Sequence, residues 1–239
     1  MHSPHGARPA TSYDSSHSLP ENEEEQPIRE MMDSLAELAR PARTALLIVD
    51  MQKDFCTPGF GAERAGRDLG PANRAMPQIA RLLEGARASG VTVAHVGFWT
   101  LPDHGSDSDT WLQKRRGATV SAPDLCIAGS EGAEFVDALA PVKGELEIRK
   151  HRYSAFTATS LDLLLRARDV RTIVVTGVST NVCVETTFRA GFELGYAVLV
   201  PPQACASWHE RLHEAALENV RHRFGATPSV DEILAVWNS

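Results

Sequence analysis

Short apolar runs recur along the chain and alternate with stretches whose apolar residues lie three or four positions apart. The runs are rich in valine, isoleucine and threonine, which favour extended backbone. Continuous apolar runs of this kind are typical of strands that are buried on both faces of a parallel sheet. The expected strands are residues 44–49, 91–98, 145–150, 173–176 and 196–200, with 226–230 as a sixth strand at the sheet edge.

The stretches between these runs have the periodicity of amphipathic helices. Pro41 closes the first of them and Gly90 is placed to end the second as a C-cap. The expected helices cover residues 27–40, 76–89, 135–139, 161–167, 185–194, 209–224 and 230–237. Because strand and helix alternate throughout, we predict an α/β fold with a six-stranded parallel sheet and helices on both faces, in three layers.

Length and composition indicate a single large domain. The chain has 239 residues, of which 43% are hydrophobic and 23% charged, values that are ordinary for a globular protein. Residues 1–26 are rich in serine, proline, histidine and glutamate and have little to bury, so we expect a flexible tail there and one domain over 27–239. The tail histidines (His2, His5 and His17) lack the spacing of a metal site.

Charge and cysteine usage exclude several classes of partner. The net charge of −7 gives no electrostatic support for binding to nucleic acid or to an anionic membrane. No apolar run approaches 18 residues, and the first residues lack the apolar segment of a secretory signal. The four cysteines are irregularly spaced, which argues against a disulfide framework or a structural zinc site. We therefore expect a cytoplasmic protein with a small-molecule partner, no nucleic acid and no membrane.

Three residues with complementary chemistry lie at or just after the ends of expected strands: Asp50, Lys150 and Cys183. The carboxyl ends of parallel strands share one edge of the sheet, so these side chains are expected to converge. An aspartate takes a thiol proton and returns it to a leaving amine, and a nearby lysine cation lowers the cysteine pKa. The start of a helix after Gly177 also favours a thiolate at Cys183. The pattern predicts nucleophilic attack on a carbonyl through an acyl-enzyme.

Each of these residues also has an ordinary structural interpretation. Most free cysteines are buried and inert, and an aspartate after a strand often caps a helix or a turn. Asp54 is expected to be solvated or to act as a cap, and His95, inside a strand, to be a core histidine whose hydrogen bonds are satisfied. The convergence of three strand ends favours the catalytic interpretation.

Residues 99–132 form a long segment with weak periodicity, which we expect to form a wall over the site. Its run Lys114 to Arg116 either grips a carboxylate or carbonyl of the substrate or forms a solvated face. The residues expected to contact the substrate are Gln52, Phe55, Trp99, Arg115, Arg116 and Tyr153.

The motifs around the three strand ends resemble those of the isochorismatase-like cysteine hydrolases, a superfamily that includes nicotinamidases, N-carbamoylsarcosine amidases, ureidoacrylate and biuret amidohydrolases, and isochorismatases proper. The matching pieces are ALLIVDMQKDF, KHRYSAF and VTGVSTNVCVETTFRAGFELGY, in this order along the chain. The resemblance covers about residues 43–237 and is nearest to the ureidoacrylate, biuret and N-carbamoyl amidohydrolase branch.

This resemblance implies a catalytic triad of Asp50, Lys150 and Cys183 on a six-stranded parallel sheet. It also implies a cis peptide bond between Val178 and Ser179 and an oxyanion hole formed by the backbone N–H groups of Ser179 and Cys183. The expected activity is hydrolysis of a C–N amide or ureido bond in a small molecule. We further expect a homo-oligomer, either a dimer or a tetramer.

Two departures bear on the subclass. Isochorismatases that cleave a vinyl ether can lack the cysteine, so its presence here favours amide hydrolysis. Nicotinamidases carry an Asp-x-His motif and a further histidine that bind a metal, whereas Asp103 and His104 are adjacent in this chain. We therefore expect no metal and no cofactor. The alternatives that stay open are a nicotinamidase- or isochorismatase-type hydrolase and a catalytically silent relative that acts as a binding or assembly module.

Overall fold

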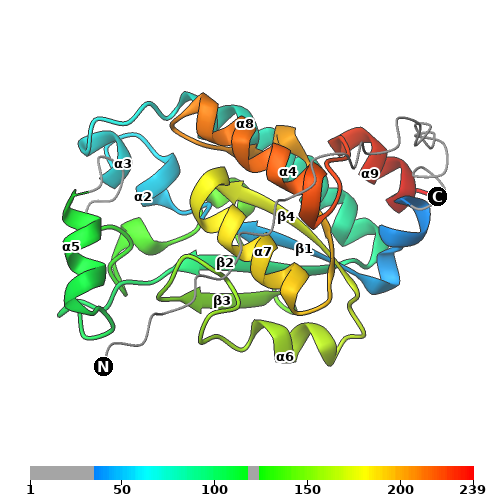
Figure 1. The fold of residues 1–239 in the computed structure, drawn as a ribbon, viewed down its shortest axis with the longest axis horizontal. Coiled ribbons are helices and arrows are strands. Elements are labelled where there is room, and N and C mark those ends of the chain that lie inside the picture. The colour runs from blue at the N-terminus through cyan, green and yellow to red at the C-terminus, as the bar shows by residue number, and fades with distance from the viewer. Residues whose placement is uncertain (1–34, 118–123) are drawn as a thin grey trace, which may run out of the picture.

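The computed structural model describes residues 35–117 and 124–239, and their core is one six-stranded sheet in which every strand pair is parallel. Five strands follow the order β3-β2-β1-β4-β5, of which Figure 1 labels β1 to β4. β6 pairs with β4 beyond the end of β5. The strands are β1 (Thr44–Val49), β2 (Thr92–Phe98), β3 (Leu146–Lys150), β4 (Thr172–Val178), β5 (Ala197–Leu199) and β6 (Cys205–Ala206). The predicted sheet is confirmed.

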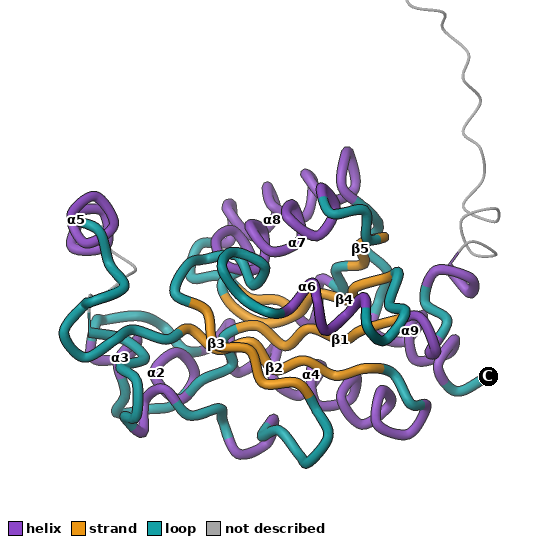
Figure 2. The backbone as a smooth tube through the Cα atoms, turned by 90° about the horizontal axis from the view of Figure 1, so that it is seen from below, coloured by secondary structure: helices purple, strands orange, loops and turns teal. Residues whose placement is uncertain are grey.

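Helices cover both faces of this sheet (Figure 2). The core on one face includes α4 (Gly70–Ser89) and α9 (Val230–Trp237). The core on the other face includes α6 (Leu161–Arg166), α7 (Glu185–Glu193) and α8 (Glu210–Asn219). The predicted three-layer arrangement is therefore present.

Alternation along the buried strands divides the core into these two halves. In β1, Leu46 and Ile48 pack with α4 and α9, whereas Ala45, Leu47 and Val49 pack on the opposite face. Every residue of β1 is buried, as expected for a strand in the middle of a covered parallel sheet.

Shorter elements gather at the carboxyl ends of the strands, toward the end of the molecule that carries α5 (Figure 1). They are α2 (Lys53–Cys56), α3 (Gly61–Arg64) and α5 (Asp109–Gly117), with the π-helical turn Thr180–Val184 that follows β4. The other short elements of the described chain are a second π-helical turn, Val220–Phe224, and 3-10 turns at Pro41–Arg43, directly before β1, and at Glu131–Ala133, Asp137–Leu139 and Pro202–Ala204. Among the described helices, none is both long and apolar enough to cross a membrane.

β1 and β4 approach each other closely at Gly177, near the end of β4. Gly177 pairs with Val49 and has a φ of +108°, in the range that favours glycine. A Cβ atom at this position would collide with the Val49 carbonyl oxygen. The close approach therefore requires glycine, and it brings the residues after the two strands near each other.

The sixth strand is not where the sequence pattern indicated. It is Cys205–Ala206, whereas in 226–230 only Ala226 pairs with the sheet, through a single bridge to Leu199. Pro228 has no N–H to donate to a ladder. The next residue, Ser229, forms a capping box with Glu232, so this segment starts α9 instead of extending a strand.

Two other expectations need correction. The helix predicted over 135–139 is only a 3-10 turn, because the preceding backbone bonds to the chain after β1: Lys53 N–H donates to Glu134 O and Val136 N–H donates to Met51 O. The helix predicted over 27–40 is described only from residue 35, and residues 35–38 are helical. The predicted tail over 1–26 lies outside the described residues.

Candidate active site

Asp50 and Lys150 form a buried ion pair at the carboxyl edge of the sheet. Lys150 ends β3, and its Nζ donates to Asp50 Oδ2 at 2.9 Å. Both side chains are essentially inaccessible to solvent, at 0% and 1% exposure. Lys150 Nζ also donates to the Arg152 carbonyl oxygen at 3.3 Å and lies 4.8 Å from the centre of the Phe98 ring. The lysine is thereby fixed against the carboxylate.

The backbone around Asp50 turns sharply at the end of β1. Asp50 has a φ of +54°, and aspartate is one of the few residues that occupies this left-handed region readily. Its N–H still donates to Val96 O at 2.7 Å and extends the β1–β2 ladder by one bond. The carboxyl group is therefore held at the sheet edge by the strands themselves.

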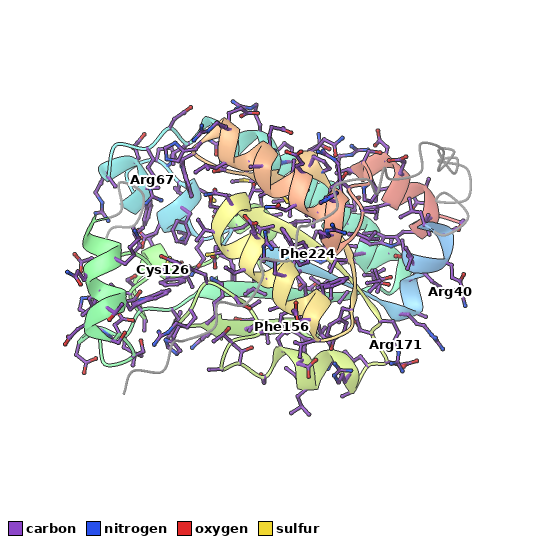
Figure 3. All side chains as sticks on the ribbon, in the orientation of Figure 1. Arg40, Arg67, Cys126, Phe156, Arg171 and Phe224 are labelled. Atoms are coloured by element: carbon purple, nitrogen blue, oxygen red, sulfur yellow. The ribbon has the colours of Figure 1, made fainter. Side chains whose placement is uncertain are left out.

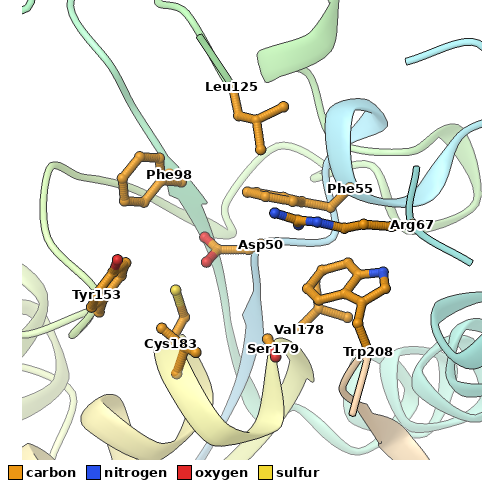
Figure 4. A pocket seen from close by; sticks show the side chains of 11 residues that line it. Asp50, Phe55, Arg67, Phe98, Leu125, Tyr153, Val178, Ser179, Cys183 and Trp208 are labelled. Carbon is orange, nitrogen blue, oxygen red and sulfur yellow. The ribbon is translucent and has the colours of Figure 1, made fainter. Parts of the chain in front are cut away.

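Cys183 lies in the π-helical turn Thr180–Val184 that links β4 to α7. Its thiol interacts electrostatically with both the Asp50 carboxyl and the Lys150 ammonium groups, which shift its pKa in opposite directions. Figure 4 shows the Cys183 sulfur and the Asp50 carboxyl group pointing toward each other. The structure thus brings together the three residues that the strand ends predicted.

Ser179 precedes this turn and lines the same cavity as Cys183. The peptide bond between Val178 and Ser179 is cis, as the resemblance implied. The Ser179 hydroxyl donates to Asn181 Oδ1 at 2.9 Å, and Ser207 donates to the same oxygen at 2.6 Å. These contacts fix the backbone beside the nucleophile candidate.

Burial dominates the electrostatics of the site. It raises the pKa of the Cys183 thiol, the Asp50 carboxylate raises it further, and the Lys150 cation opposes both. The lysine lowers the cysteine pKa as expected, but desolvation outweighs it, so the net shift is upward. The thiol is protonated at neutral pH and needs a base.

The pKa shifts of Asp50 and Lys150, the two partners of the thiol, are compatible with proton transfer from the thiol to the carboxylate. Burial raises the pKa of Asp50, although Lys150 lowers it, and a carboxylate of higher pKa is a stronger base. Burial disfavours the Lys150 cation, but attraction to Asp50 and Cys183 outweighs this effect and raises the pKa of the lysine. Lys150 therefore stays charged while protons move between the other two groups.

A cavity that opens to solvent lies beside Cys183 (Figure 4). Its walls are mostly aromatic and aliphatic, which suits a small ligand with few polar groups. The lining residues are Asp50, Phe55, Arg67, Phe98, Leu125, Tyr153, Val178, Ser179, Val182, Cys183 and Trp208.

Two of the residues expected to contact the substrate, Phe55 and Tyr153, line this cavity. Gln52 and Trp99 line a different and larger hollow on the β2–β3 side. The side-chain amide of Gln52 is already hydrogen-bonded to the backbone: its oxygen accepts from Phe98 N–H, and its nitrogen donates to Phe98 O and Ala133 O. Trp99 lies under the guanidinium of Arg149, 4.1 Å from its ring centre. Neither is brought to Cys183.

The basic run Lys114 to Arg116 belongs to α5, which lies at one end of the molecule in both Figure 1 and Figure 2. The side chains of Arg115 and Arg116 are outside the described part of the chain, so their contact with substrate stays a prediction. From the 99–132 segment, Leu125 does line the cavity.

Sequence reasoning missed three residues of the cavity that matter to its chemistry: Arg67, Leu125 and Trp208. Arg67 comes from a stretch, residues 56–73, whose many glycine and arginine residues are typical of a loop. Trp208 follows the sixth strand, whose position was not recognised. No local signal distinguishes such residues, because only long-range packing brings them to the sheet edge.

Two secondary candidates have structural roles. Asp54 is buried instead of solvated, and it accepts from the N–H groups of Gly61 at 3.0 Å and Cys126 at 2.7 Å. His95 is a buried core residue as predicted, and its Nε2 lies 2.8 Å from Glu145 Oε2. The expectation that its hydrogen bonds are satisfied is wrong for Nδ1, which is buried without a partner among the described residues. Asp54 thus ties the loops around the cavity together.

The described residues include no group of three or more His, Cys, Asp or Glu side chains positioned to hold a metal ion. His104, from the region where nicotinamidases carry their ligands, places Nδ1 3.1 Å from Asp107 Oδ2. The absence of a metal in the working protein stays a prediction, with a test described below.

Comparison with known proteins agrees with this architecture. Residues 44–232, most of the chain, match the model of the isochorismatase domain. The chain belongs to the isochorismatase family. Among curated members of this family, it is 38% identical to the ureidoacrylate amidohydrolase RutB of Methylobacterium radiotolerans over 195 residues, which cover 77% of this chain and 76% of that protein. The RutB of Azorhizobium caulinodans is 36% identical over 78% of this chain and 87% of its own.

Solved structures of the isochorismatase family share the fold. A cysteine hydrolase from Pseudomonas syringae superposes with a TM-score of 0.72 at 29% identity, covering 83% of this chain and 94% of its own. The nicotinamidase PncA from Bacillus subtilis superposes with a TM-score of 0.65 at 26% identity, covering 78% and 99% of the two chains.

Proposed function

We propose that this isochorismatase-family protein is a cysteine hydrolase that cleaves the C–N bond of a small linear amide or ureido compound. The observation that carries the proposal is the buried cluster of Asp50, Lys150 and Cys183 at one end of an apolar cavity. Similarity to proteins named ureidoacrylate amidohydrolase supports the same reaction class.

In the first half of the reaction, Cys183 Sγ attacks the carbonyl carbon while its proton passes to Asp50. The ammonium group of Lys150 stabilises the negative charge that is shared between sulfur and carboxylate. The oxygen of the tetrahedral intermediate faces the backbone N–H groups of Ser179 and Cys183, which act as the oxyanion hole. Asp50 then returns the proton to the leaving nitrogen, the C–N bond breaks, and ammonia or an amine departs.

In the second half, water enters the place that the amine has left. It transfers a proton to Asp50 as its oxygen attacks the thioester carbonyl, and collapse of the intermediate expels Cys183 Sγ. The sulfur recovers the proton from Asp50, and the acid or carbamate leaves. The proton balance closes over the cycle, and each step uses only the three side chains and the two N–H groups.

The test is ammonia release from a panel of small amides and ureido compounds. Cys183→Ala should lower kcat/KM by at least about 10⁴-fold while the thermal melt is retained, because the covalent route is removed. Cys205→Ala is the matched control: Cys205 is also buried, but lies in β6, outside the cavity lining.

Intact-mass measurement after rapid quenching should also find the acyl group on Cys183. Activity that survives Cys183→Ala would contradict the mechanism. If no member of the panel releases ammonia or forms an adduct, the protein is better described as a silent binding or assembly relative. The predicted homo-oligomer is checked separately, by light scattering during gel filtration.

A further inference from the structure

Arg67 is a buried cation that has no anionic partner. Its side chain belongs to a residue only 9% exposed, and its Nε and Nη2 atoms are fully buried without a hydrogen-bond partner among the described residues. No carboxylate of the described chain lies within ion-pair distance of it. Lys150, the other buried cation of the site, is paired with Asp50. A buried charged group without hydrogen bonds destabilises the folded protein. We therefore ask whether a bound ligand would pair with Arg67.

The aromatic residues around Arg67 hold it in place but do not satisfy it. Its guanidinium carbon lies 4.5 Å from the centre of the Trp208 ring. Figure 4 shows the guanidinium between Phe55 and Trp208 with its end directed into the cavity. Stacking fixes the plane of the guanidinium and stabilises its charge through the ring face. The N–H groups point along that plane, and those on Nε and Nη2 have no hydrogen-bond partner among the described residues.

The charge of the cavity points to an anion. Asp50 and Lys150 neutralise each other, and the thiol of Cys183 is protonated at rest. Among the described lining residues, Arg67 then leaves one positive charge in excess, although the whole protein carries −7. Burial lowers the pKa of Arg67 to about 10, so it keeps its charge at neutral pH.

We propose that Arg67 binds a carboxylate of the substrate, and that the enzyme therefore acts on a small amide or ureido acid. This rests on the proposed amide-hydrolase function. A planar carboxylate accepts two parallel hydrogen bonds from the fork of a guanidinium and carries the single negative charge that balances the cavity. Arg67 and Cys183 line the same cavity, so one small ligand can contact both. The carboxylate is thus an anchor at one end, and the scissile carbonyl lies at the other.

The kinetic test compares two substrates that share a ureido group and similar length: 3-ureidopropionate, which is an acid, and n-butylurea, which is neutral. Arg67→Gln should lower kcat/KM for the acid by about 100-fold or more, mainly through KM, and change that for n-butylurea by less than about 3-fold. Arg67→Lys should fall between, because it keeps the charge and loses the fork. Arg74→Gln, at an exposed arginine of α4, is the matched control and should change neither value.

Equal losses on both substrates would overturn the proposal, since they would indicate a structural role for Arg67. An unchanged preference for the acid in Arg67→Gln would overturn it as well. Inhibition of the wild-type enzyme offers a measurement that needs no variant. Propionate should compete with n-butylurea, whereas propionamide at equal concentration should not, and equal inhibition by the two would contradict an anion site.

A binding measurement separates this proposal from the proposed reaction. Calorimetry with Cys183→Ala should detect binding of 3-ureidopropionate that is lost in Cys183→Ala/Arg67→Gln. If that difference is found but the wild type hydrolyses neither compound, the anion site stands and the amide-hydrolase function fails. If both compounds are hydrolysed and bound without regard to Arg67, the reaction stands and the anion site fails.

Discussion

The two edges of the sheet use charged residues in opposite ways. At the amino edge, Glu145 precedes β3 and accepts hydrogen bonds from Arg87, His95 and the N–H of Val142. At the carboxyl edge, the Asp50–Lys150 pair lies beside a protonated thiol, and Arg67 has no anionic partner among the described residues. Figure 3 places Arg67 and Cys126 toward the carboxyl edge and Arg40 and Arg171 toward the opposite one.

This difference separates groups that stabilise the fold from groups that are kept ready for a ligand. Burial disfavours the charge of Glu145, but its hydrogen bonds outweigh burial and hold its pKa at about 2. Burial raises the pKa values of Asp50 and Cys183, because no comparable set of donors compensates for it. We expect substitutions at the amino edge to alter stability and those at the carboxyl edge to alter activity.

The largest effect is expected where the proposed catalytic residues depend on one another. Asp50→Asn and Lys150→Met should each lower kcat/KM by about 10³-fold or more, and the double variant should be little worse than the weaker single one, because the residues act as a unit. The measurement is the kinetics of the four proteins on one amide substrate. Fully additive losses in variants of normal stability would argue against a shared role.

The same four proteins also test stability at the carboxyl edge. Lys150 is the position there at which a substitution should lower the free energy of unfolding. Lys150→Met leaves Asp50 buried and unpaired, which should lower the free energy of unfolding by about 3 kcal/mol at pH 7. The loss should shrink at low pH, where Asp50 takes up a proton, and in Asp50→Asn/Lys150→Met, which removes both charges. Lys143→Met, at an exposed lysine, is the control. Equal instability of the single and double variants would refute the pairing argument.

A smaller effect is expected at the amino edge. The pKa of Glu145 falls from 4.5 unfolded to about 2 folded, so its contribution to stability is present above pH 4.5 and is lost as the pH falls toward 2. Glu145→Gln should lower the melting temperature at pH 7 by a few degrees and flatten its decline between pH 5 and pH 3. Glu147→Gln, at an exposed neighbour on β3, should leave that decline unchanged.

Catalysis by Glu145→Gln should be near normal at 25 °C and neutral pH. A loss of kcat as large as that of Asp50→Asn would contradict the distinction between the two edges. It would show that Glu145, which is not among the residues that line the cavity, affects catalysis.

The smallest expected effect is that of metal removal. The proposed chemistry stabilises the oxyanion with backbone N–H groups, so dialysis against EDTA should leave kcat/KM within about 2-fold. Metal analysis of the purified protein should find no stoichiometric ion. An enzyme that loses activity on chelation and regains it with zinc would restore the nicotinamidase-type interpretation.

The sequence predicted those features that depend on local pattern. Apolar runs located β1 to β5, and the residues at three strand ends located Asp50, Lys150 and Cys183. It could not locate β6, because a two-residue strand has no periodicity of its own. It could not identify Arg67 as a site residue, because its importance comes from what surrounds it after folding. The thiol pKa was misjudged for the same reason, since burial is a property of the whole fold.

The contact of Gly177 with Val49 has a consequence for how the protein tolerates change. The distance between the base and the nucleophile is set where two main chains touch, one residue before Asp50 and a few residues before Cys183. A side chain at Gly177 would wedge the two strands apart and widen the gap between the two segments that follow them.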